Sequence, residues 1–85
     1  MKEIKYVITD EVGIHARPAG LLVQEAKKFT STITFIKGEK SAKATSLMKL
    51  MGMGIVKGDE VTITVEGEDE EAAAAAIESF MKANF

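Results

Sequence analysis

The sequence predicts an α+β fold in which four strands and three helices follow one another in the order βαββαβα. Four segments alternate apolar and polar residues, which is the period of a strand with one buried face. Three other segments repeat apolar residues at helical spacing. Because every strand has one apolar face and every helix one apolar stripe, two layers suffice, with three helices on one side of a four-stranded sheet.

The first part of the chain is predicted to form a strand followed by a helix. Residues 3–9 alternate, with Ile4, Tyr6 and Ile8 on one side, and the alternation ends at the polar segment 10–13. A helix is expected to begin at Ala16. Its buried face is expected to consist of Ala19, Leu22, Val23 and Ala26, with Phe29 closing it.

The rest of the chain is predicted to hold three strands and two helices. Strands are expected at 32–36 and 40–44, joined by a hairpin turn, and a further strand at 61–66. A short helix is expected at 47–51. A longer helix is expected at 69–84, because its acidic first turn suits the positive end of a helix dipole. The residues that this helix is expected to bury are Ala73, Ala76, Ile77, Phe80 and Met81.

Length and composition favour a single domain, residues 1–85. Hydrophobic residues make up 46% of the chain and charged residues 28%, which is typical of a globular protein and argues against disorder. No apolar run approaches the ~20 residues of a membrane helix, and the first residues lack the apolar core of a signal peptide. We therefore expect a cytoplasmic monomer that does not insert into a membrane.

Residue counts exclude several kinds of site. The chain has no cysteine and one histidine, so neither a disulfide framework nor a metal site is expected, and no cofactor is implied. Residues 1–50 carry a charge balance of +4 and residues 51–85 one of −6. A solvated acidic helix explains this asymmetry, and a basic face for anions or acidic proteins is the alternative. No aromatic residues are interleaved with the basic ones, so nucleic acid is not an expected partner.

The segment Gly13–Ala19 places a histidine where the first strand gives way to the first helix. Pro18 has no N–H, so it is tolerated in a first helical turn, which puts His15 at or just before the helix start. The helix start, formed by Ala16, Arg17 and Pro18, would be a site for phosphate through its free N–H groups, to which proline does not contribute. The forked guanidinium of Arg17 favours phosphate further, and an unprotonated imidazole is a nucleophile.

On this chemistry alone, a second interpretation stays open, in which His15 is a polar helix cap and Arg17 a surface cation. The segment nevertheless resembles the active-site signature of the histidine-containing phosphocarrier (HPr) family of the bacterial sugar phosphotransferase system. The similarity extends to residues 22–26, 46–48 and 67–70, and so to essentially the whole chain.

The resemblance has consequences for fold and for function. It implies an open-faced β-sandwich, with an antiparallel sheet in the strand order 1-4-2-3. It also implies that enzyme I charges His15 with a phosphoryl group derived from phosphoenolpyruvate, and that the A domains of enzymes II accept this group. Arg17 would stabilise the group during transfer. The chain would be a covalent intermediate in sugar transport rather than an enzyme.

Ser46 is a second candidate site, because it comes just before the predicted short helix. By residue type it is an N-cap, whose hydroxyl accepts a hydrogen bond from the first turn. In HPr proteins of the Gram-positive type, the matching serine is phosphorylated by HPr kinase/phosphorylase for carbon catabolite repression. The resemblance therefore implies a phosphoserine that slows charging of His15 and docks onto catabolite control protein A. Phosphate at a helix start is compatible with a cap.

A partner-docking surface is expected beside Ser46. A methionine-rich stripe is more often core, and Leu50 is expected there, but a five-residue helix ending before Gly52 cannot bury all its sides. The resemblance implies that the first helix completes the surface. The expected docking residues are Leu47, Met48, Met51, Gly20 and Gln24.

Two rival functions belong to other classes. A purely regulatory HPr-like binding module would act through Ser46 without phosphotransfer, but relatives of that kind lack the active histidine that this chain has at position 15. A small hydrolase such as an acylphosphatase would need an asparagine to position water. The one asparagine, Asn84, lies at the far end of a predicted helix.

Overall fold

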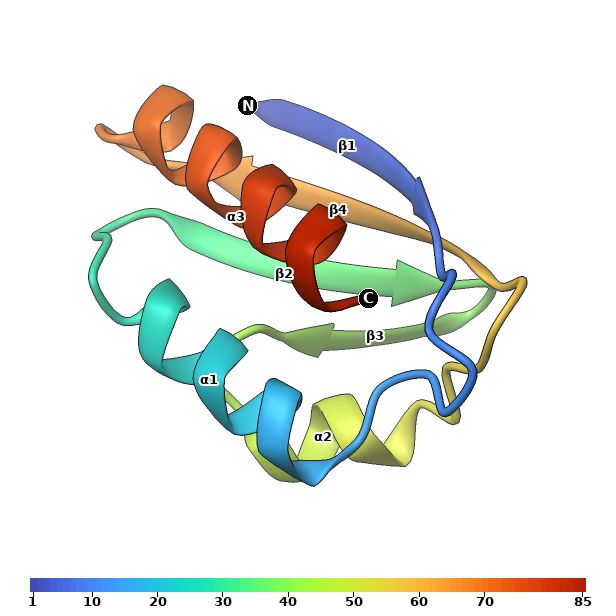
Figure 1. Ribbon diagram of the computed structural model, residues 1–85. Helices are drawn as coiled ribbons and strands as arrows, with labels where there is room; N and C mark the ends of the chain where they lie inside the picture. Colours follow the sequence, from blue (N-terminus) through green and yellow to red (C-terminus); the bar gives the residue numbers. More distant parts are fainter.

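Four antiparallel strands, from both the N-terminal and the C-terminal half of the chain, form one sheet. A computed structural model describes residues 1–85, and the strand order is β1-β4-β2-β3, as predicted. Figure 1 shows the three helices on the same side of this sheet, which leaves its other side open. The elements are β1 (Lys2–Val7), α1 (Ala16–Ala26), β2 (Thr32–Lys37), β3 (Lys40–Lys43), α2 (Leu47–Gly52), β4 (Glu60–Glu66) and α3 (Glu70–Asn84).

The strand register gathers the apolar side chains under the helices. Ile63 of the central strand β4 lies opposite Ile4 of β1 on one side and Phe35 of β2 on the other. Ile63 and Phe35 are fully buried, whereas Thr34 and Thr64, which pair on the opposite face, are half-buried. One buried face per strand is therefore sufficient to build the core, as the alternation predicted.

The first helix buries the predicted face and ends earlier than the pattern suggested. Ala19, Leu22, Val23 and Ala26 are its buried residues. The helix ends at Ala26, where the N–H of Lys28 turns to the carbonyl of Glu25 at 3.2 Å. Phe29 lies beyond the end, half-buried against the core. Phe29 therefore extends the buried face of α1 from the loop that follows the helix, and not from the helix itself.

The other two helices differ from prediction in detail. Gly52 is the last residue of α2 rather than the residue that stops it. In α3, Ala74 is buried, whereas Ala76 and Phe80 are only half-buried, so the buried stripe is rotated slightly from the predicted one. Ile8 is buried but lies just after β1, which ends at Val7. None of the helices has the length and hydropathy needed to cross a membrane.

Asp69 connects α3 to the beginning of β2 instead of capping its own helix. It stands at the N-cap position of α3 but makes no capping hydrogen bond. Its carboxylate accepts the N–H groups of Thr30 at 2.8 Å and Ser31 at 2.9 Å, and also the Ser31 hydroxyl. The hydrogen bond from Ser31, and then that from the Thr30 N–H, lower the pKa of Asp69. The helix begins at Glu70, one residue after the expected start, and Asp69 is its N-cap residue.

Candidate functional site

His15 is the N-cap residue of α1, as its place in the sequence predicted. Its backbone is extended, with φ −136° and ψ 171°, and its carbonyl accepts the Ala19 N–H at 2.9 Å. The side chain makes no capping hydrogen bond and is half-buried. The interpretation of His15 as a side-chain cap is therefore wrong, and the imidazole makes no hydrogen bond within the protein.

The first turn of α1 places a cation and free N–H groups beside His15. Pro18 is the third residue of α1. The first four N–H groups of a helix have no acceptor within it, so the N–H that proline lacks would have been unpaired in any case. Arg17 is exposed and forms none of the ion pairs or side-chain hydrogen bonds of the protein. Arg17 and the N–H groups of Ala16 and Arg17 thus remain free to contact an anion.

The connection from β1 to α1, which contains the residues before His15, packs against the connection from α2 to β4. Figure 1 shows these two connections side by side. The Ile14 N–H donates to the Ile55 carbonyl at 3.1 Å. Gly13 has φ +78°, and a Cβ built there would lie 2.3 Å from the same carbonyl oxygen and 2.7 Å from the Cα of Val56. Only glycine allows so close an approach at this backbone angle, which explains its place before His15.

A hydrogen-bonded pair of side chains holds that connection in place. The Asp59 carboxylate accepts the Val56 N–H at 2.9 Å and the Lys37 ammonium at 2.6 Å. Lys37 also donates to the Gly54 carbonyl at 2.9 Å. The hydrogen bond from Lys37, and then that from Val56, lower the pKa of the Asp59 carboxyl. Sequence reasoning missed both residues, since it assigned Lys37 only to a hairpin turn and gave Asp59 no role.

Ser46 stands at the N-cap position of α2, but the predicted capping hydrogen bond is absent. Its carbonyl accepts the Leu50 N–H at 3.0 Å, while the half-buried hydroxyl has no partner within the protein. Ser46 lines a hollow of about 340 Å³ together with the exposed residues Lys43 and Lys49. The hydroxyl is thus available beside two cations.

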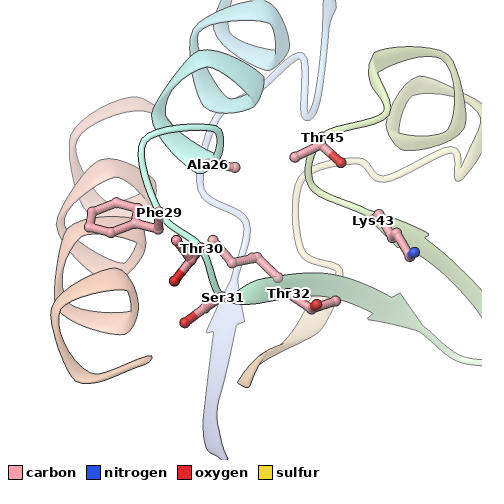
Figure 2. Close-up of a pocket in the computed structure, with 8 residues that line it drawn as sticks. Ala26, Phe29, Thr30, Ser31, Thr32, Lys43 and Thr45 are labelled. Carbon is pink, nitrogen blue, oxygen red and sulfur yellow. The ribbon is translucent and has the colours of Figure 1, made fainter. Parts of the chain in front are cut away.

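The surface hollows lie away from His15 and Arg17, neither of which lines any of them. Figure 2 shows one of about 260 Å³ beyond the C-terminal end of α1, with Ala26 and the following loop on one side and Lys43 and Thr45 on the other. Because the predicted reactive residues are on the open surface, another protein can reach them directly.

Nearly the whole chain is similar to proteins of one family. The family model described as the PTS HPr component phosphorylation site matches residues 2–83. The phosphocarrier protein HPr of Mycoplasma capricolum is 46% identical over 81 residues, which cover 95% of this chain and 91% of that protein. This chain belongs to the HPr family. HPr is a phosphocarrier of the phosphotransferase system and not a catalytic enzyme.

Solved structures share the HPr fold. HPr from Thermoanaerobacter tengcongensis is 41% identical, with a TM-score of 0.92 and coverage of 98% of this chain and 93% of that one. Crh of Bacillus subtilis, described as a catabolite repression protein, is 37% identical, with a TM-score of 0.78 and coverage of 98% and 95%. The predicted βαββαβα architecture and family are therefore confirmed.

An HPr protein must present a surface to other proteins, and exposed apolar side chains gather on α2. Met48 is 85% exposed, Met51 43% and Leu47 37%, whereas Leu50 is fully buried, as predicted. On α1, which neighbours α2 in Figure 1, Gln24 is exposed and Gly20 half-buried. The exposed apolar residues that were not predicted to dock are Met1, Val7, Val12, Leu21 and Val56.

Proposed function

We propose that the whole chain, residues 1–85, is a single domain that accepts a phosphoryl group from enzyme I on His15. It then passes the group to the A domains of enzymes II in the cytoplasm, during sugar uptake. The observation that carries the proposal is the unbonded, half-exposed imidazole at the N-cap of α1, beside the free guanidinium of Arg17. Membership of the HPr family supports the two kinds of partner.

The chemistry follows from this arrangement. A ring nitrogen of His15 attacks the phosphorus, and the bond that held the phosphoryl group on enzyme I breaks as the new P–N bond forms. Negative charge on the phosphoryl oxygens is stabilised by the Arg17 guanidinium and by the helix-start N–H groups. The acceptor protein attacks the same phosphorus in the second transfer, and His15 leaves as a neutral imidazole after regaining any proton it released.

Mass spectrometry tests the first transfer. After incubation with enzyme I and phosphoenolpyruvate, the intact protein should gain one acid-labile phosphoryl group, and His15→Ala should gain none while remaining folded. A purely regulatory module would gain none even with His15 present. A hydrolase would release phosphate continuously instead of accumulating the labelled protein.

We also propose that Ser46 is phosphorylated by HPr kinase/phosphorylase and that the product binds catabolite control protein A. The free hydroxyl beside Lys43 and Lys49 supports this role, because both cations can approach a phosphate dianion. The added charge, about −1.5 to −2, would stand next to Leu47 and Met48. Similarity to the HPr family implies that the face of enzyme I that docks there is acidic, so the charge would repel it.

Two substitutions at Ser46 separate a regulatory role from a structural one. Ser46→Asp should slow phosphorylation of His15, and added salt should restore part of the rate, because exposed charges are screened over ~10 Å at 0.1 M salt. Ser46→Ala should keep the normal rate. This variant should also lower the free energy of unfolding by less than the ~1 kcal/mol that a typical cap contributes, since no capping hydrogen bond is lost. Equal rates for the two variants would remove the regulatory role.

A further inference from the structure

One peptide unit connects the segment that ends at His15 to the ion pair between Lys37 and Asp59. The peptide between Ile55 and Val56 accepts the Ile14 N–H on its carbonyl, at 3.1 Å. Its N–H donates to the Asp59 carboxylate, at 2.9 Å. Because a peptide unit is planar, the group that orients the N–H also fixes the direction of the carbonyl. Asp59 therefore orients the carbonyl that holds the Ile14 N–H, while the Ile14 side chain packs into the core.

Lys37 in turn fixes Asp59 to the sheet. It is the last residue of β2, and its ammonium group lies 2.6 Å from the Asp59 carboxylate and 2.9 Å from the Gly54 carbonyl. Both ends of the segment 54–59 are thus tied to one strand end. A charged acceptor also polarises the peptide and strengthens the hydrogen bond on its other side.

Ile14 is the residue immediately before His15, so a displacement of one moves the other. The rest of α1 is held independently, because its buried face packs into the core. If the Ile55–Val56 peptide moved, His15 would turn relative to Arg17 and to the N–H groups of the helix start. Such misplacement is costly in transfer reactions, where an error of ~1 Å can lower the rate by as much as 10²-fold.

We propose that Lys37 and Asp59 are positioning residues for phosphoryl transfer, which orient His15 through the Ile55–Val56 peptide without touching the phosphoryl group. This inference rests on the proposed function of His15. It predicts that breaking the pair changes the rate of transfer more than it changes the binding of enzyme I.

The test uses the intact chain with enzyme I and phosphoenolpyruvate, and compares Lys37→Met and Asp59→Asn with wild type. Both variants should lower the maximal rate of His15 phosphorylation by about tenfold, with the half-saturating concentration changed by less than about twofold. Lys37→Arg should restore most of the rate, because a guanidinium can also donate to both acceptors. The matched control is Lys40→Met. Lys40 lies opposite Lys37 in the β2–β3 register and makes no ion pair, so its loss should leave the maximal rate unchanged.

Hydrogen exchange separates positioning from general stability. The Ile14 amide should exchange faster in Lys37→Met than in wild type, while amides of the central strand β4 keep their protection. The double variant should be no slower than the worse single variant, because both changes break the same connection.

Several results would overturn the inference. A maximal rate for Lys37→Met within about twofold of wild type would do so. A second such result would be a rise only in the half-saturating concentration of enzyme I for Lys37→Met, with an equal rise for Lys40→Met. Lys37 would then act as a docking charge. Failure of wild type itself to accept phosphate would instead contradict the proposed function, so the two failures are distinguishable.

Discussion

Replacing Gly13 by alanine should destabilise the protein and displace the segment that ends at His15. The added Cβ would have to occupy a point 2.3 Å from the Ile55 carbonyl oxygen, and it would do so at φ +78°. The left-handed backbone costs a non-glycine residue about 1–2 kcal/mol. Relief of the clash must break the 3.1 Å hydrogen bond from Ile14, which costs about another 1–2 kcal/mol if the groups stay unpaired. The free energy of unfolding should therefore fall by about 2–4 kcal/mol.

Urea unfolding followed by circular dichroism measures this change, with Gly20→Ala as the matched control. Gly20 is inside α1, and a Cβ there meets nothing within 4 Å. The same methyl group should therefore stabilise the protein by about 0.5–1 kcal/mol through helix propensity. If Gly13→Ala unfolded within about 0.5 kcal/mol of wild type, the close approach of the two connections could not be what positions His15.

Three further predictions concern charge and docking. Arg17→Ala should slow phosphoryl transfer by about 10²-fold at saturating enzyme I, without loss of stability, as measured by rapid-quench kinetics and thermal unfolding. Asp69→Asn should lower Tm at neutral pH. The pKa of Asp69 is lowered in the folded protein, so its stabilisation is full above the usual aspartate pKa of about 4. That stabilisation is lost as the pH falls through the lower folded value, so the Tm values of variant and wild type should converge in acid. Met48→Ala should weaken enzyme I binding by roughly tenfold in calorimetry and change the free energy of unfolding by less than about 0.5 kcal/mol, because Met48 is 85% exposed.

Local sequence patterns were sufficient to predict the elements and the position of His15. The spacing of Ala19, Leu22 and Ala26 defines a helical face, and Pro18 restricts the helix start to its neighbourhood. Both signals act within one or two turns of chain, so the sequence displays them directly. The strand order came from the resemblance to the HPr family and not from periodicity.

The features that sequence reasoning missed depend on contacts between distant residues. Lys37 and Asp59 meet only because β2 and the turn before β4 lie side by side, and neither residue has an unusual local setting. Asp69 carries an acidic side chain suited to a helix start, yet it accepts hydrogen bonds from Ser31, 38 residues away in the sequence, instead. For Ser46, residue type predicted the N-cap position but not the orientation of its hydroxyl.

The central claim is that the group held on His15 is passed on rather than lost. The protein would be loaded with a labelled phosphoryl group from enzyme I and phosphoenolpyruvate, freed of enzyme I, and mixed with the A domain of an enzyme II. The label should leave His15 and appear on the A domain in equal amount, with little inorganic phosphate. Label that stays on this chain, or that appears only as inorganic phosphate, would contradict it.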